Sequence, residues 1–272
     1  ESALSAYRMA RMFDPNSFDF KRGQAMCLIK TEQLRSAIAL FDELIVEKPE
    51  ESTFWVAQAN AFLSSEQTVK AIANLQMLSD AGTSTWESQR MLGDLYLNED
   101  LSKLALDSYA LGYRKHPPVA ASQAVQPLIY LVGRRCFEEA QTFFQLIQSD
   151  IQGKLGLELQ RQVNTALARI EMRLGDPEKA YAILTASVEE DPLDGNSLIL
   201  LGEYLLETQD YEESEYYFER ATALRSFEAD AYISLGRLQV KQGKLKAALI
   251  PLRKAQKVEN TPNLQRYIES IE

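Results

Sequence analysis

A small residue returns along this chain at steps close to 34 residues, and this period limits the fold more than any other feature. The steps are 34, 34, 34, 35, 40, 34 and 34 residues, between Ala3, Ala37, Ala71, Ala105, Ala140, Ala180, Ser214 and Ala248. A large apolar residue follows each one by four positions, at Tyr7, Phe41, Leu75, Tyr109, Phe144, Leu184, Phe218 and Leu252. Residues four apart share one face of a helix, so each period predicts a helix with a small and a large contact point. A regular period of this length is typical of stacked repeats.

Another helix is predicted ahead of each of these helices, so that each repeat has a first helix and, carrying the small residue, a second helix. In the clearest period the first helix carries an apolar stripe with the i, i+3, i+4, i+7 spacing of an amphipathic helix, at Leu198, Leu201, Gly202 and Leu205. Prolines recur where the following helix should end, at Pro15, Pro49, Pro117 and Pro192. Proline lacks an N–H and pushes its predecessor out of the helical region, so it ends a helix. The sequence therefore predicts an all-α solenoid of antiparallel helix-turn-helix repeats.

The Leu-Gly pairs at Leu92-Gly93, Leu201-Gly202 and Leu235-Gly236 give the repeat a family resemblance, and Tyr96 follows the first pair by three residues. The pattern resembles the tetratricopeptide repeat, which reads W-x2-L-G-x2-Y, then A-x3-F, then P. The resemblance covers essentially the whole chain. It implies a right-handed superhelical solenoid that binds a partner in its concave groove.

The repeat phase predicts one solenoid over residues 1–272. Its units are 18–51, 52–85, 86–119, 121–154, 161–194, 195–228 and 229–262, with 1–17 the second helix of an incomplete repeat and 263–272 a capping helix. The fourth unit is the weakest, because Pro127 and Leu128 stand at its Leu-Gly positions. A six-residue excess with Gly153 and Gly156 follows it, which predicts a kink at 151–160.

The N-terminal segment lacks a first helix to pack against. We expect this to leave part of an apolar stripe uncovered, at Leu4, Tyr7 and Phe13. The simplest interpretation is a fragment of a longer protein with more repeats upstream. The alternative is that the stripe binds a partner or a second copy of the chain. Residues 1–13 do not have a signal-peptide pattern, and no apolar run approaches the roughly 20 residues that span a bilayer.

Residues that carry chemistry are scarce. The chain has one histidine, His116, and two cysteines, Cys27 and Cys136, which we interpret as packing thiols. No phosphate-binding loop, nucleophile elbow or zinc motif is present. The sequence therefore predicts no enzyme activity, no cofactor and no metal site. A net charge of −10 disfavours nucleic acid as a partner and favours basic or mixed-charge proteins.

The resemblance implies ligand contacts at set positions of each first helix. Carried onto this sequence, they predict a site for a protein or peptide at Arg22, Lys30, Asn60, Arg90, Asp94, Asn98, Arg169, Arg173, Glu203, Glu207, Arg237 and Lys241. The last six alternate in sign from unit to unit, so they could instead pair with one another as exposed ion pairs worth about 0–1 kcal/mol each. Both interpretations stay open. The pattern that holds the C-terminal tails of Hsp70 and Hsp90 is disfavoured, because Met91 stands where that pattern needs Asn.

We predict a non-enzymatic scaffold for protein–protein interaction. One alternative is a structural or assembly spacer in a larger bacterial secretion or envelope protein, as similar repeats are in polysaccharide export. Another is the regulatory repeat region of an enzyme whose catalytic domain is absent, as in sugar transferases with such repeats.

Overall fold

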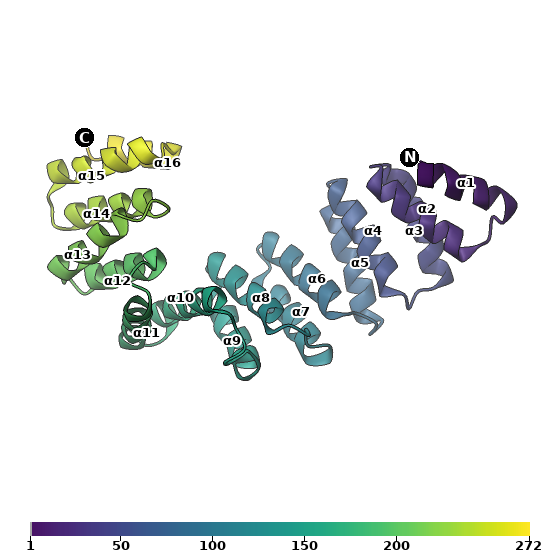
Figure 1. The fold of residues 1–272 in the computed structure, drawn as a ribbon, viewed down its shortest axis with the longest axis horizontal. Coiled ribbons are helices and arrows are strands. Elements are labelled where there is room, and N and C mark those ends of the chain that lie inside the picture. The colour runs from purple at the N-terminus through teal and green to yellow at the C-terminus, as the bar shows by residue number, and fades with distance from the viewer. Residues whose placement is uncertain (1) are drawn as a thin grey trace. The chain divides into compact units, whose positions relative to one another are not determined.

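The computed structural model describes residues 2–272, and in that range it contains helices and turns but no strand (Figure 1). The helices are α1 (Ser2–Phe13), α2 (Phe18–Lys30), α3 (Leu34–Glu47), α4 (Ser52–Ser64), α5 (Thr68–Asp80), α6 (Trp86–Asn98), α7 (Ser102–Lys115), α8 (Ala121–Gly133), α9 (Phe137–Ile151), α10 (Leu157–Leu174), α11 (Pro177–Glu190), α12 (Gly195–Glu207), α13 (Tyr211–Thr222), α14 (Glu228–Lys241), α15 (Leu245–Val258) and α16 (Pro262–Glu269). The chain is an all-α helical-repeat solenoid, as the period predicts.

The helices pair as hairpins within two compact units, Glu1–Gln152 and Gly153–Glu272. In the first unit α2 packs on α3, α4 on α5, α6 on α7 and α8 on α9, with α1 against α2. In the second unit α10 packs on α11, α12 on α13 and α14 on α15, and α16 covers α15. The predicted units and the kink at 151–160 remain predictions about how these hairpins group.

The small residue of the second helix is fully buried in every hairpin from α2–α3 to α14–α15. The alanines from Ala37 onward in the series have no exposed surface, and neither does Ser214, whose hydroxyl donates to the carbonyl oxygen of Gly202 at 2.8 Å. Large rings are accommodated by glycines on the paired first helix. A Cβ added to Gly93 would overlap the Tyr109 ring, and one added to Gly202 would overlap Phe218. The Leu-Gly positions are therefore steric requirements of the hairpin.

The fourth hairpin corrects one expected core residue. Phe143 is fully buried in α9, whereas Phe144, which the four-residue spacing selects, is only partly buried. The buried face of α9 runs through Ala140, Phe143, Ile147 and Ile151. Its first step is three residues instead of four, and both spacings keep a residue on one helical face.

A shared turn closes six of the seven hairpins. In each, one residue has a left-handed φ between 58° and 76°, at Glu32, Glu66, Asp100, Arg135, Gln209 and Gly243. The N–H of the next residue donates to the carbonyl oxygen five residues earlier, for example Asp210 to Leu205 at 2.9 Å. This six-to-one bond is the Schellman motif, which satisfies carbonyls at a helix end. The α10–α11 turn differs, because there Asp176 accepts from the N–H groups of Glu178 and Lys179 at the start of α11.

The linker between the units is shorter than the spacing suggests. Since α10 begins at Leu157, part of the six-residue excess lengthens α10, and only 152–156 lie outside the two helices. Gly153, in this linker, has a φ of 70° that favours glycine.

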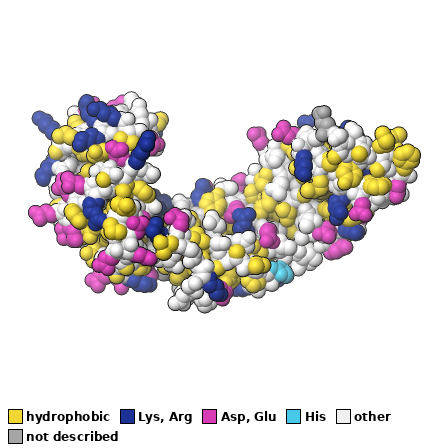
Figure 2. Space-filling view, viewed as in Figure 1, with side chains coloured by type: hydrophobic (Ala, Val, Ile, Leu, Met, Phe, Trp, Pro, Cys, Tyr) yellow, Lys and Arg dark blue, Asp and Glu magenta, His cyan; other side chains and the backbone are white. Residues whose placement is uncertain are grey.

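The apolar surface of α1 differs from the expected stripe. Leu4 is buried and Tyr7 is half-buried against Gly23, so of the three expected residues only Phe13 is exposed. Met9 and Met12 join Phe13 in its place, and the three are 62%, 82% and 86% exposed. Figure 2 shows hydrophobic atoms where α1 lies. We name Met9, Met12 and Phe13 the α1 patch. Within residues 2–272, no helix has the length and apolar character to cross a membrane.

Candidate functional site

The first helices of the three hairpins in the second unit lie side by side, with α10 against α12 and α12 against α14. A cavity of about 210 Å³ opens on the side that they form. Its lining comes from these helices and from the segments that lead into them: Arg169, Asn196, Ile199, Leu200, Glu203, Phe227, Asp230, Ile233, Ser234 and Arg237. We name it the first-helix cavity.

Three of the predicted site residues meet in this cavity because of the period. Arg169, Glu203 and Arg237 are spaced by 34 residues, so they occupy the same position of α10, α12 and α14. Equivalent positions of stacked hairpins line up across the stack. The alternation of charge in the sequence therefore becomes a row with a carboxylate between two guanidinium groups.

The carboxylate of Glu203 lies half-buried in this row. Burial raises the pKa of Glu203 above its usual 4.5, while the charges of Arg169 and Arg237 act to lower it. Burial is the larger effect, so the folded protein disfavours the charged form of this side chain. No ion pair within 4.0 Å joins Glu203 to either arginine in the part of the chain that the structure describes.

The other three predicted residues of the second unit, Arg173, Glu207 and Lys241, do not form ion pairs with one another either. The ammonium of Lys241 donates to the carbonyl oxygen of Leu206 at 3.0 Å. Arg173 and Glu207 are exposed, and neither takes part in the ion pairs of residues 2–272. Arg173 and Glu207 are therefore exposed to a ligand without an ion pair to break.

The first-helix cavity also has apolar residues in its lining. Ile199 and Leu200 from α12 and Ile233 from α14 line it, together with Phe227 at the start of α14. Gly195 makes room for Phe227, since a Cβ at Gly195 would overlap that ring. The cavity therefore offers both charged and apolar groups to a ligand.

Sequence reasoning missed the contributions that come from helix starts. Asn196, Phe227 and Asp230 line the cavity, but they lie one turn or more before the positions that the family resemblance selects. The one signal that points to them is Gly195, the helix-start glycine that seats Phe227.

The predicted residues of the first unit are engaged in contacts within the chain. Arg90 forms an ion pair with Asp94 at 2.6 Å, and the Tyr109 hydroxyl donates to the same carboxylate at 2.7 Å. The Tyr130 hydroxyl donates to the side-chain oxygen of Asn98. Asp94 and Asn98 thereby connect α6 to α7 and α8, while Arg90 pairs within α6.

The remaining predicted residues of the first unit lie at the surface. Arg22 pairs with Asp19 at 3.6 Å on its own helix, which leaves it half exposed. Lys30 and Asn60 are exposed on α2 and α4. The structure therefore gathers three of the second unit's six candidates, Arg169, Glu203 and Arg237, around one cavity and leaves those of the first unit apart.

The residues with chemical potential are dispersed. His116 is exposed at the end of α7, where Figure 2 shows it at the surface, and Cys27 and Cys136 are free thiols. Between residues 2 and 272, no three His, Cys, Asp or Glu side chains are placed to hold a metal ion.

Known proteins resemble this chain in fold. The model of the tetratricopeptide repeat family matches residues 165–229 and 214–264. A tetratricopeptide repeat protein from Parabacteroides merdae is 12% identical with a TM-score of 0.61, and the match covers 93% of this chain and 98% of that one.

Two further structures are similar. The C-terminal part of a repeat protein from Cytophaga hutchinsonii has a TM-score of 0.58 at 12% identity, covering 92% of this chain and 98% of that one. PilF of Pseudomonas aeruginosa has a TM-score of 0.52 at 14% identity, covering 83% of this chain and 100% of that one. No curated protein matches in sequence. At these identities the likeness is one of fold.

Proposed function

We propose that this chain, which matches the tetratricopeptide repeat model over residues 165–229 and 214–264, is a non-enzymatic scaffold that binds a peptide segment of a partner protein in the first-helix cavity. Proteins with this fold are typically interaction scaffolds, so binding is the class of function that the family favours. In this proposal the first-helix cavity is the place where the partner is held.

The row of Arg169, Glu203 and Arg237 is the observation that carries this proposal. Their charges face one cavity without an ion pair within 4.0 Å, and burial disfavours ionised Glu203. A half-buried carboxylate with a raised pKa costs folding stability at neutral pH. Such an arrangement is typical of a binding site, where a ligand supplies the missing partners.

The lining favours a mixed-charge segment with one apolar side chain. Arg169 and Arg237 would donate to a carboxylate of the peptide, and Glu203 with Asp230 would accept from its N–H groups or from a basic side chain. The apolar side chain would lie on Ile199 and Phe227. A mixed-charge partner also suits the net charge of −10.

A peptide selection tests this function because it samples many candidate partner sequences at once. A library of random displayed peptides is selected on the wild-type chain and on the Arg169→Glu/Arg237→Glu variant. The matched control is Arg225→Glu/Lys257→Glu, which makes the same charge change at two exposed residues that do not line the cavity.

We expect wild type and control to enrich one mixed-charge motif and the cavity variant to lose it. Circular dichroism of all three proteins shows whether the fold is kept. Enrichment of the same motif on the cavity variant would place binding elsewhere and contradict the proposal.

We also propose self-association through the α1 patch as a second candidate function. The observation that favours it is the run of Met9, Met12 and Phe13, exposed together on one helix. Contiguous apolar surface of this kind marks interaction sites. Sedimentation velocity of the wild type and a Met12→Glu/Phe13→Glu variant tests it. A dimer in the wild type that dissociates in the variant supports this role, and a monomer at every concentration contradicts it.

A further inference from the structure

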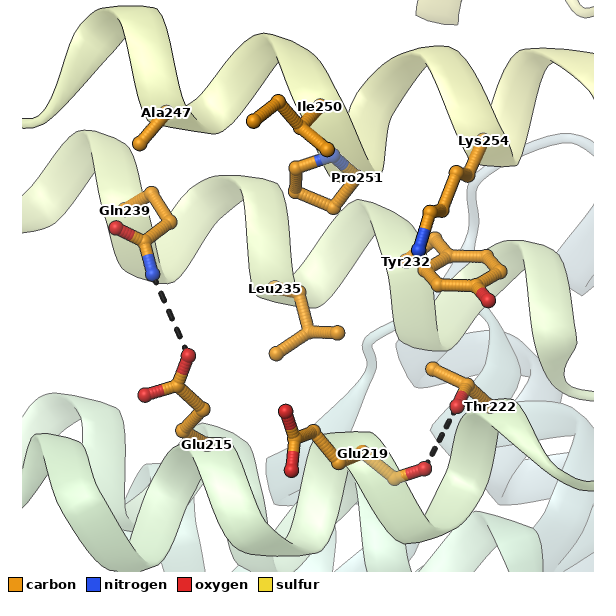
Figure 3. A pocket seen from close by; sticks show the side chains of 10 residues that line it. All are labelled: Glu215, Glu219, Thr222, Tyr232, Leu235, Gln239, Ala247, Ile250, Pro251 and Lys254. Atoms are coloured by element: carbon orange, nitrogen blue, oxygen red, sulfur yellow. Dashed lines mark hydrogen bonds between the residues drawn. The ribbon is translucent and has the colours of Figure 1, made fainter.

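A larger cavity, of about 390 Å³, lies between α13, α14 and α15 (Figure 3). This volume falls within the range of roughly 300–1,000 Å³ that is usual for ligand pockets. Its lining consists of Glu215, Glu219, Thr222, Tyr232, Leu235, Gln239, Ala247, Ile250, Pro251 and Lys254. We name it the second-helix cavity, since α13 and α15 are the second helices of their hairpins.

The two cavities lie on opposite sides of α14. Tyr232, Leu235 and Gln239 line the second-helix cavity, and their spacing of three and four residues places them on one helical face. Ile233 and Arg237 line the first-helix cavity and share a different face. At about 100° per residue these faces point away from each other. A ligand in one cavity therefore leaves the other open.

One wall of the second-helix cavity is acidic and lacks a cation. Glu215 and Glu219 are four residues apart on α13, and Figure 3 shows both carboxylates pointing into the cavity. Like charges at this spacing destabilise a helix. Neither carboxylate takes part in an ion pair within 4.0 Å among residues 2–272. Gln239 donates to Glu215 across 3.5 Å, which is a long hydrogen bond.

The opposite wall and the floor are mainly apolar. Ile250 and Pro251 from α15 face Leu235 from α14. Ile250 is 64% exposed, so this wall has room to bury a partner side chain. Pro251 has no N–H to donate to the carbonyl of Ala247, so one more acceptor at this wall lacks its helical partner.

The cation among the lining residues, Lys254, lies against an aromatic ring. The ammonium of Lys254 lies 5.2 Å from the centre of the Tyr232 ring, at the end of the cavity away from Glu215 (Figure 3). A cation over an aromatic face is attracted to the ring. Lys254 thus closes one end and leaves the acidic wall open.

We propose that the second-helix cavity binds an arginine side chain from an apolar segment of a partner protein. A guanidinium group has five donors in a planar fork, which suits two carboxylates side by side better than the compact ammonium of lysine. The neighbouring apolar side chain of the segment packs on Leu235 and Ile250. This site is separate from the first-helix cavity and takes ligands of different chemistry.

Three capped tripeptides test the proposal: acetyl-Leu-Arg-Leu-amide, the neutral isostere with citrulline in place of arginine, and the acidic analogue with glutamate. Each is titrated into the ¹⁵N-labelled chain, and amide shifts are followed by NMR. We expect saturable shifts on α13, α14 and α15 with the arginine peptide, and at least about tenfold weaker binding of the other two.

Two conservative variants locate the binding. Glu219→Gln should weaken binding of the arginine peptide about tenfold, because it replaces a charge-assisted pair by a neutral one. Glu212→Gln, an exposed change on the same helix that does not line the cavity, should leave the affinity unchanged.

Equal binding of all three peptides would overturn the proposal, as would unchanged affinity in the Glu219→Gln variant. Shifts that map to Arg169 and Arg237 would also overturn it, since they would assign the peptide to the first-helix cavity. If the first-helix cavity bound no peptide, these results would not change. The two proposals can therefore fail separately.

Discussion

Two half-buried carboxylates, Asp94 and Glu203, differ in whether other side chains of the chain pair with them. Burial raises the pKa of both. Asp94 is compensated by an ion pair with Arg90 and a hydrogen bond from Tyr109. Glu203 has two guanidinium groups in its cavity but no ion pair with them. The first carboxylate therefore has its partners within the chain, whereas the second has no ion-pair partner in the proposed site.

The Glu203→Gln change should make the protein more stable at pH 7. Because the folded pKa of Glu203 is raised above 4.5, its contribution to stability is present below pH 4.5 and is lost as the pH rises through the folded pKa. Glutamine removes that loss. Urea unfolding of both proteins at pH 4 and pH 7 measures it, and we expect the gain only at pH 7. A variant that is less stable at pH 7 would show that the two arginines outweigh burial.

The Tyr109→Phe change should cost about 2 kcal/mol of unfolding free energy, since it removes a hydrogen bond to a buried carboxylate. The Tyr109 side chain is fully buried, so no water replaces its hydroxyl. The control is Tyr216→Phe, because Tyr216 is 55% exposed. Denaturant unfolding of the three proteins compares them, and equal loss in both variants would contradict a structural role for the Asp94 contacts.

At the scale of the element, the repeated turn is the feature that could not be predicted from the sequence. The helices and their pairing follow from the 34-residue period, because apolar spacing and proline stops are read directly. The Schellman turns were not predicted, since the left-handed residue is usually glycine and here five of six are Glu, Asp, Arg or Gln. Only Gly243 carries the usual signal.

The features of the candidate site also divide into those that the sequence predicted and those that it did not. Arg169, Glu203 and Arg237 were predicted because the family resemblance assigns ligand contacts to their position in each first helix. The hydrogen bond that engages Asp94 was not predicted, because its partner Tyr109 lies on another helix and only packing brings it near. The second-helix cavity gave no sequence signal, since it depends on how closely α13 and α15 approach.

We predict opposite stability changes for substitutions at the left-handed residues of two of these turns, Gln209 and Gly243. Gln209 has a φ of 67°, a conformation that costs a side-chain residue about 1–2 kcal/mol, so Gln209→Gly should stabilise the protein by up to about 1 kcal/mol after the added chain entropy. Gly243 has a φ of 76°, so Gly243→Ala should destabilise by about 1 kcal/mol. Thermal unfolding checks both signs, and a loss of stability in Gln209→Gly would contradict the assignment of strain.

At the scale of the molecule, the second unit carries the binding functions that we propose. Three of its hydrophobic clusters lie wholly within Gly153–Glu272, the largest built around Leu184, Leu198 and Leu201. Both cavities are lined by residues of this unit. In a stack whose repeats contact their neighbours, such a unit has what it needs to fold alone.

Residues 153–272 should therefore fold and bind as a separate protein. We expect a helical circular dichroism spectrum and a cooperative thermal transition, together with the peptide affinity of the whole chain. Residues 1–152, prepared in the same way, should fold without binding the selected peptide. Binding by 1–152 alone would contradict the placement of the site in the second unit.

The most direct test of the central claim is the affinity of a selected peptide for the first-helix cavity. Isothermal titration calorimetry compares the wild type with Arg169→Glu/Arg237→Glu and with the charge-matched control Arg225→Glu/Lys257→Glu. We predict that the cavity variant binds at least about tenfold more weakly, since it loses charge-assisted hydrogen bonds, and that the control binds like the wild type. Equal loss in both variants would reduce the interaction to net charge, and no loss in the cavity variant would show that the first-helix cavity is not the site.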